Sequence, residues 1–175
     1  MFSKLKGFVT SKSILIVGNA QSALNKSREI DTNFDIIVRI NLGYPENKEE
    51  FIGYRTDIWA TSYEIDLETV NKKIAPKFIL WMTPKNQDKM SAFYKKNAIL
   101  YPNDMWLRLK YLLKARPSTG CMVIDMLHHL NPNITLLGFD FWKTKSWMRQ
   151  VKYTGPHNPS AEKEYVKSLK LKELK

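Results

Sequence analysis

The chain of 175 residues contains one cysteine, Cys121. A single cysteine excludes an internal disulfide and a zinc site built from several cysteines. No stretch of the sequence approaches the roughly 18 consecutive apolar residues that suggest a transmembrane helix. The segment 1–8 also lacks an apolar run of signal-peptide length. From these residue types we expect a protein of the reducing cytoplasm.

Acidic residues are few relative to basic ones: 17 Asp and Glu stand against 28 Lys and Arg, which gives a net charge of +11. Such a surface attracts nucleic acid, anionic lipid or a negatively charged substrate, and charge alone does not choose among them. Part of the excess lies in the last fourteen residues, which contain Lys163, Lys167, Lys170, Lys172 and Lys175. We expect this tail to form a basic helix, which is either a solvated face or a surface attracted to an anionic membrane.

Apolar residues make up 43% of the chain, and its length suits one domain, 1–175, with a core of its own. Apolar runs predict strands at 13–17, 35–40, 56–60, 77–82, 98–101 and 133–137. Helical patterns fall at 22–27, 66–73, 87–96, 103–114, 118–130 and 162–175, and the segment 43–55 is polar and predicted as a loop. This alternation predicts a single-domain, Rossmann-like α/β fold with a mainly parallel sheet and helices on both faces. Ligands bind such sheets at the carboxyl ends of the strands.

Small and polar residues stand where predicted strands end. Gly18, after the first strand, would let a backbone approach a ligand closely. Asn19 and Asn41, after the first and second strands, each offer a hydrogen-bond donor and an acceptor. The turn Gly138-Phe139-Asp140-Phe141 follows the last predicted strand. The clusters at Gly18-Asn19 and Asn41, together with the helix start at 117–120, have the ingredients of an anion and nucleotide pocket.

A second group of small polar residues opens a predicted helix. Ser118, Thr119 and Gly120 follow Pro117, and free N–H groups at a helix N-terminus favour a phosphate or a carboxylate. Each cluster alone also suits an ordinary turn or helix cap. The segment after Gly18 lacks the second and third glycines of the dinucleotide fingerprint.

The ordered set of clusters resembles the sialyltransferases. Ile16-Val17-Gly18-Asn19, then Arg39-Ile40-Asn41 and Gly53-Tyr54-Arg55-Thr56-Asp57, resembles the long sialyl motif of the animal-type family. Pro117-Ser118-Thr119-Gly120 with Leu136-Leu137-Gly138-Phe139-Asp140-Phe141 is similar to the short motif. His157 and Glu162, with four residues between them, resemble the very short motif. The bacterial sialyltransferase family has a similar layout, with counterparts of Arg116 and of the turn at 138–141. The resemblance runs from about residue 13 to residue 162.

The resemblance implies a variant of the glycosyltransferase GT-A fold. It also implies transfer of a sialic acid or related sugar acid from a CMP donor to a glycan hydroxyl, with inversion and with no cofactor or metal. His157 would be the general base, because the unperturbed pKa of histidine lies near neutrality. Glu162 would orient the His157 loop or begin the last helix.

The remaining roles implied by the resemblance concern the nucleotide. Ser118, Thr119 and Gly120 would bind the phosphate, with Tyr153 or Arg116 assisting. Asn19 and Asn41 would hold the ribose and the phosphate. Asp140 would either order the loop after its strand or contact the base or ribose. The nearest pair of acidic residues, Glu64 and Asp66, is more typical of a helix start than of a metal site.

Three alternatives remain open at this point. The motifs indicate CMP and a carboxylate, so a CMP-Kdo transferase of surface polysaccharide synthesis fits them as well. The net charge admits a basic nucleic-acid-binding module, although the aromatic residues fall in predicted buried positions and no nucleic-acid partner is expected. The chain could also keep the fold without the activity. The oligomeric state and the acceptor are not indicated by the sequence.

Overall fold

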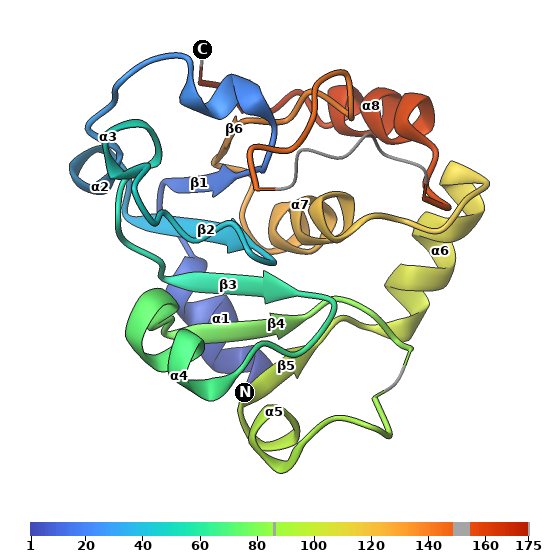
Figure 1. Cartoon of the computed structure of the whole chain (residues 1–175). Coiled ribbons are helices and arrows are strands. Elements are labelled where there is room, and N and C mark those ends of the chain that lie inside the picture. Colours follow the sequence, from blue (N-terminus) through green and yellow to red (C-terminus); the bar gives the residue numbers. More distant parts are fainter. Residues whose placement is uncertain (86, 149–154, 175) are drawn as a thin grey trace.

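Seven parallel strands form the centre of the molecule in a computed structural model, which describes residues 1–85, 87–148 and 155–174 (Figure 1). The strands are β1 (Ile14–Val17), β2 (Ile36–Ile40), β3 (Ile58–Thr61), β4 (Phe78–Trp81), β5 (Ala98–Leu100), β6 (Ile134–Leu137) and β7 (Lys172–Glu173). Their order in the sheet is β5-β4-β3-β2-β1-β6-β7. In the central register Ile14 pairs with Ile36 on one side and with Ile134 on the other.

Helices cover both faces of this sheet. The α-helices are α1 (Phe2–Val9), α2 (Ile30–Asn33), α3 (Glu49–Ile52), α4 (Leu67–Thr69), α5 (Ala92–Asn97), α6 (Asn103–Leu113), α7 (Thr119–Leu130) and α8 (Pro159–Ser168), with a 3-10 helix η1 (Gln21–Leu24) and a π-helix η2 (Val70–Ile74). Alternate residues of each buried strand point to opposite faces, so Ile14 and Ile16 pack under α1, α6, α7 and α8. Leu15 and Val17 pack on the other face, under η1, α2 and α3. The predicted α/β architecture with two covered faces is confirmed.

The strand order reverses beside β1. Segments η1, α2, α3, α4 and α5 connect β1 through β5 over one face, whereas α6, α7 and α8 connect β5, β6 and β7 over the other. Crossovers that leave neighbouring strands toward opposite faces open a crevice at the carboxyl ends of those strands. In this chain the crevice lies between the ends of β1 and β6.

The prediction of a loop over 43–55 was wrong, because this segment contains the helix α3. The N-terminal segment, for which no element was predicted, forms α1, whose Leu5 and Val9 are fully buried one helical turn apart. In contrast, Asp66 is confirmed as a helix N-cap, because its carboxylate accepts a hydrogen bond from the Thr69 amide.

The predicted basic helix 162–175 is also wrong in its second half. Helix α8 ends at Ser168, Lys170 takes a left-handed backbone conformation with φ +54°, and the chain continues into β7. Leu174 explains this change, because its amide donates to the Leu136 carbonyl and its side chain packs on the core. The tail lysines therefore do not share one helical face.

Part of the segment that resembles the long motif stabilises the sheet. Arg39, within β2, is fully buried, and its guanidinium donates to the carbonyls of Ile52 and Gly53 and to the Thr56 hydroxyl. Burial lowers the pKa of Arg39 to about 10. These contacts fix the chain between α3 and β3 and leave Asn41 at the strand end.

None of the described helices is both long and apolar enough to cross a bilayer.

Candidate active site

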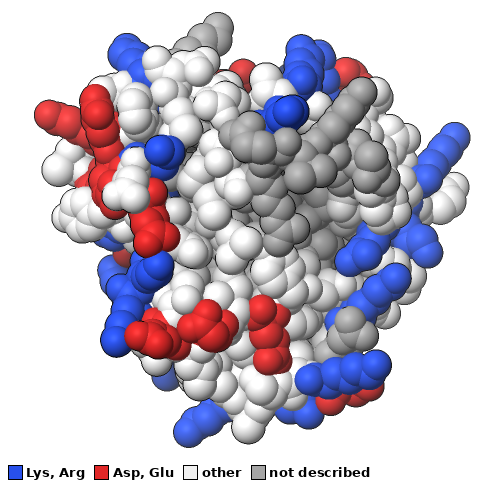
Figure 2. Space-filling view, in the orientation of Figure 1, with Lys and Arg blue, Asp and Glu red and all other residues white. Residues whose placement is uncertain are grey.

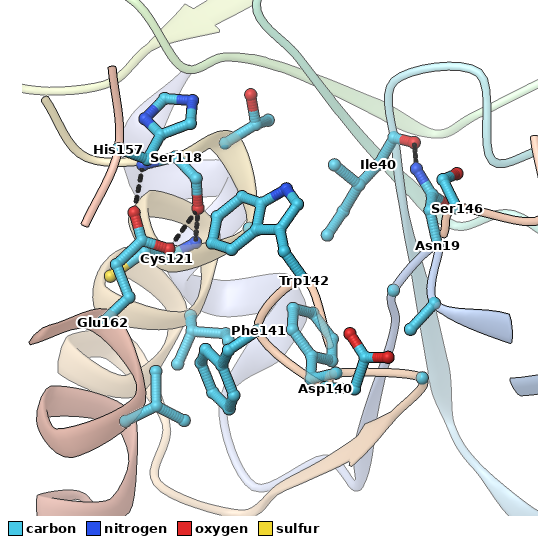
Figure 3. Close-up of a pocket in the computed structure, with 18 of the residues that line it drawn as sticks. Asn19, Ile40, Ser118, Cys121, Asp140, Phe141, Trp142, Ser146, His157 and Glu162 are labelled. Carbon is cyan, nitrogen blue, oxygen red and sulfur yellow. Dashed lines mark hydrogen bonds between the residues drawn. The ribbon is translucent and has the colours of Figure 1, made fainter. Parts of the chain in front are cut away.

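A cavity of about 420 Å³ occupies the crevice at the carboxyl ends of the central strands (Figure 3). Its walls come from the ends of β1, β2 and β6 and from the N-terminal parts of α7 and α8. Of the predicted site residues, it brings together Gly18, Asn19, Asn41, Ser118, Thr119, Gly120, Asp140 and His157. Tyr153 lies outside the described residues.

The two glycines at the ends of β1 and β6 allow these strands to approach closely. A Cβ atom on Gly18 would lie 2.3 Å from the carbonyl oxygen of Gly138, and Gly138 itself has φ +71°. The neighbouring backbone alone is therefore sufficient to require glycine at position 18, which also lines the cavity. The effect on the site is indirect, since the close approach sets the width of the crevice.

Asn19 turns its side chain toward the protein. Its Nδ2 donates to the Ile40 carbonyl over 3.2 Å, and its Oδ1 would lie only 2.3 Å from a Cβ atom on Gly43. Oδ1 is buried and has no hydrogen-bond partner among the described residues. Asn19 thus lines the cavity while its amide fixes the loop after β2.

Asn41 is held in a left-handed conformation, φ +52°, at the end of β2. Its Oδ1 accepts from the Ser62 amide (3.1 Å) and its backbone carbonyl accepts from Trp59 Nε1 (2.7 Å). Asparagine tolerates this conformation better than most residues do. Because Oδ1 is used by the protein, Nδ2 is the group that Asn41 offers to a ligand.

Ser118 caps α7, and its side chain is used inside the protein. Its Oγ accepts from the Cys121 amide over 3.1 Å and donates to Glu162 Oε2 over 2.6 Å, while its amide donates to Glu162 Oε1 over 2.7 Å (Figure 3). The predicted phosphate contact through the Ser118 hydroxyl is therefore corrected. That hydroxyl joins the start of α7 to the side of α8.

The next two residues present the helix terminus to the cavity. The amide N–H groups of Thr119 and Gly120 have no acceptor among residues 1–85, 87–148 and 155–174. Thr119 Oγ1 lies 2.6 Å from Ser62 Oγ, which places a hydroxyl pair beside them. Free N–H groups and the helix dipole favour an anion at this point.

Glu162 is the buried acid of this wall, with 2% of its surface exposed. Burial raises the pKa of Glu162 to about 7, although its two hydrogen bonds from Ser118 act in the opposite direction. Glu162 lies within α8, where its carboxylate accepts both hydrogen bonds from Ser118 and its amide donates to the carbonyl of Asn158, the residue after His157. The sequence did not indicate the partnership with Ser118, which joins residues 44 positions apart.

His157 lies on the cavity wall in a fixed orientation. Its Nδ1 is 2.7 Å from the Arg116 carbonyl, so Nδ1 carries the proton and the neutral ring has its lone pair on Nε2. The ring stacks on Trp142, with centroids 5.7 Å apart and an interplanar angle of 21°. Burial lowers the pKa of His157 below its usual value, which keeps the ring neutral at pH 7.

Arg116 contributes its backbone and not its side chain. Its carbonyl fixes the His157 tautomer, whereas its side chain lines a separate surface hollow at the end of α6. Arg116 is not among the residues that line the cavity, so this arrangement gives no support to the predicted phosphate contact by its guanidinium. The direction of a side chain on a short loop between two helices is not visible in a sequence pattern.

The loop after β6 forms the floor of the cavity. Asp140 accepts hydrogen bonds from both the amide and the hydroxyl of Thr144, so it orders the loop, one of the two roles considered for it. Phe141 and Trp142 both have left-handed backbone conformations, with φ +55° and +61°. Strained residues of this kind concentrate at functional sites. Trp142 is the residue that the sequence reasoning missed, although it directly follows the turn that was singled out.

No cluster of three or more metal-ligating side chains occurs in the part of the chain that the structure describes. Of the acidic pair, Asp66 caps α4 and Glu64 accepts a hydrogen bond from the Ser91 amide.

The comparisons with known proteins concern the fold. No family model matches the sequence, and a comparison with curated proteins finds no match. Among solved structures, the sialyltransferase CstII from Campylobacter jejuni, in complex with the substrate analogue CMP-3FNeuAc, is 15% identical. The match covers 93% of this chain and 80% of that one, with a TM-score of 0.66.

Two further structures are similar over most of the chain. The monofunctional α-2,3-sialyltransferase Cst-I from Campylobacter jejuni is 19% identical over 90% of this chain and 71% of its own, with a TM-score of 0.67. A mammalian sialyltransferase is 18% identical over 94% of this chain and 69% of its own, with a TM-score of 0.63. The seven-stranded fold of this chain is thus similar to the fold of bacterial and mammalian sialyltransferases.

Proposed function

We propose that the chain is a single-domain glycosyltransferase that moves a sialic acid or a related sugar acid from a CMP donor to a glycan hydroxyl, with inversion and with His157 as the general base. The observation that carries the proposal is the His157 ring on the cavity wall, held in one tautomer by the Arg116 carbonyl. The fold supports it, because a similar protein, CstII, is described in complex with a CMP-sugar analogue.

The nucleotide would bind between the strand ends and α7. The N–H groups of Thr119 and Gly120 would donate to its phosphate, and Nδ2 of Asn41 would reach the phosphate or the ribose. Negative charge grows on the phosphate as the sugar leaves. Preorganised donors at a helix N-terminus stabilise such charge most where water is excluded.

The proton of the acceptor hydroxyl would pass to Nε2 of His157. The acceptor oxygen then forms a bond to the anomeric carbon while the bond from that carbon to the phosphate oxygen breaks, and CMP leaves with the electron pair. The lowered pKa of His157 suits a base that must be neutral before the reaction. Attack from the side opposite the leaving group inverts the anomeric centre.

Independence of metal and cofactor is part of the proposal. Its support is chemical: a nucleoside monophosphate is a stable leaving group, and the N-terminus of α7 supplies positive potential where its charge develops. Addition of a chelator should leave the rate unchanged.

The experiment supplies purified protein with CMP-Neu5Ac or with CMP-Kdo and follows CMP release. We expect release from one of the two donors, which also identifies the sugar acid. The matched variants are His157→Ala and His128→Ala, because His128 lies on α7 outside the cavity. Absence of release from both donors would contradict the proposal, and equal rates in wild type and His157→Ala would remove His157 from the mechanism.

A further inference from the structure

The outward face of α6 exposes large apolar side chains. Leu107 is 53% exposed and Tyr111, one helical turn later, is 83% exposed, with Leu112 beside them at 51%. The opposite face of the same helix buries Leu109 and Leu113 in the core. Exposed Leu and Tyr at the centre of a solvent-facing helix surface are unfavourable unless another surface covers them.

Basic side chains surround these apolar ones. Lys110, Lys114 and Arg116 line the same hollow, and no acidic residue lines it. The one acidic residue of α6, Asp104, lies in its first turn. Figure 2 shows Lys and Arg along the side of the molecule where α6 runs in Figure 1, whereas acidic side chains gather over α2 and α3 on the other side. The α6 face is therefore both apolar and positively charged.

We propose that this α6 face, consisting of Leu107, Lys110, Tyr111, Leu112, Lys114 and Arg116, docks on a membrane surface that contains anionic lipid. Leu and Tyr would enter the boundary between head groups and acyl chains, while the lysines extend their charged ends to the lipid phosphates. A second copy of the chain fits less well, because two α6 faces in symmetric contact would bring their lysines together.

The α6 face is connected directly to the His157 loop. The Leu113 carbonyl, at the end of α6, accepts from Asn158 Nδ2 over 3.4 Å, and the Arg116 carbonyl accepts from His157 Nδ1. Docking would thus place the cavity rim near the lipid surface, where a membrane-bound acceptor would lie. Membrane docking itself does not depend on the proposed transfer, and its test needs no activity.

The tail lysines supply a matched comparison, since the sequence also suggested them as the membrane contact. Lys167 and Lys170 are exposed near the end of α8 and outside the α6 face. The double variant Lys167→Glu with Lys170→Glu changes the net charge by the same amount as Lys110→Glu with Lys114→Glu. If binding to anionic vesicles depended only on the overall positive charge of the protein, the two double variants would weaken it equally.

The experiment measures flotation of the full chain with phosphatidylcholine vesicles that contain or lack phosphatidylglycerol. We expect binding only to the anionic vesicles. The Lys110→Glu, Lys114→Glu variant should bind at least about 25-fold more weakly, since each lysine near an anionic surface contributes about a fivefold factor. The Leu107→Ser, Tyr111→Ser variant should lose at least about tenfold, because its apolar contact is removed. The tail variant should lose about threefold or less, because distant charges are screened.

Several results would overturn the proposal. They are no binding of the wild type to anionic vesicles, an equal loss in the tail variant, or unchanged binding of the Leu107→Ser, Tyr111→Ser variant. Light scattering on the same proteins tests whether a second copy of the chain covers this face instead of a membrane. A wild-type dimer that becomes monomeric in the Leu107→Ser, Tyr111→Ser variant would assign the face to a second copy of the chain.

Discussion

The two walls of the cavity use their polar groups in different ways. On the wall made by strand ends, Asn19 and Asp140 direct hydrogen bonds to the protein itself, and Gly18 serves the contact with Gly138. On the wall made by α7, α8 and the loop that precedes α8, His157 and Glu162 carry titratable groups at the cavity. The strand-end wall therefore fixes the shape of the site, and the helix wall carries the titratable groups that we propose for proton transfer, together with the N–H groups of Thr119 and Gly120.

Burial shifts the two titratable groups of the helix wall in opposite directions. It lowers the pKa of His157 and raises that of Glu162 to about 7. Both shifts have the same cause, because a desolvated site favours the neutral form of each group. The wall thus limits its own charge, so that the phosphate of the proposed CMP donor would meet little negative charge beside the helix N-terminus.

The largest expected effect comes from removing the proposed general base, His157, from the helix wall. His157→Ala should reduce the rate of transfer by about 10²–10⁴-fold and leave CMP affinity nearly unchanged, because a base acts in the transition state. Steady-state kinetics and calorimetric CMP titration would measure the two effects. A parallel loss of affinity would show that His157 is a binding residue instead. In the wild type the acidic limb of the rate profile should lie below pH 6.5, the ordinary pKa of histidine, since the pKa of His157 is lowered.

The buried acid of the same wall gives the next effect. The pKa of Glu162 is raised from 4.5 to about 7 in the folded protein, so the folded state retains a proton that the unfolded state releases. The free energy of unfolding should therefore fall by about 3 kcal/mol as the pH rises from 4.5 to 7. Glu162→Gln should remove this decline, whereas Glu164→Gln, at an exposed position of α8, should keep it. Urea unfolding from pH 4.5 to 7 measures this decline. If the difference in unfolding free energy between wild type and Glu162→Gln does not change with pH, the raised pKa of Glu162 is refuted.

The strand-end wall is tested through its closest backbone approach. In Gly18→Ala the new Cβ would lie 2.3 Å from the Gly138 carbonyl oxygen, so the ends of β1 and β6 must separate. We expect a loss of about 1–3 kcal/mol in unfolding free energy, together with weaker CMP binding. Gly7→Ala is the control, because a Cβ there meets nothing within 4 Å on α1, and it should stabilise the chain by about 0.5–1 kcal/mol. Equal stability of the two variants would contradict the shape role of this wall.

The smallest effect concerns the one amide nitrogen that the strand-end wall offers to a ligand. Asn41→Gly keeps the left-handed conformation and removes the amide, so CMP affinity should fall by about three- to tenfold. Asn47→Gly changes an exposed asparagine with φ +60° outside the cavity and should leave affinity unchanged. Calorimetry with CMP compares the two variants. Unchanged affinity in Asn41→Gly would mean that Nδ2 does not reach the nucleotide.

Buried strands could be predicted from the sequence because a parallel sheet covered on both faces requires continuous apolar runs, such as 14–17. Short helices such as α3 escaped prediction, since one helical turn contains too few apolar residues to show a period. The tail was misjudged because its lysines suggested one helical face, although Leu174 anchors the last segment to the sheet.

Within the site, the residues that approach the cavity could be predicted, but their contacts could not. Ser118 was correctly placed at a helix start, yet its hydroxyl is used by Glu162, which comes from another helix. Arg116 was predicted for its charge and acts through its carbonyl. Such pairings depend on how helices pack in space, and a pattern along the chain contains no measure of that distance.

We propose that the helix wall binds the phosphate of CMP and places His157 beside the reacting sugar. A crystal structure of the chain with CMP would show whether it does. We expect the phosphate at the N–H groups of Thr119 and Gly120, with Asn41 Nδ2 in contact with the nucleotide and the open side of the cavity toward His157. CMP bound at another place, or turned with its base toward the N-terminus of α7, would contradict it.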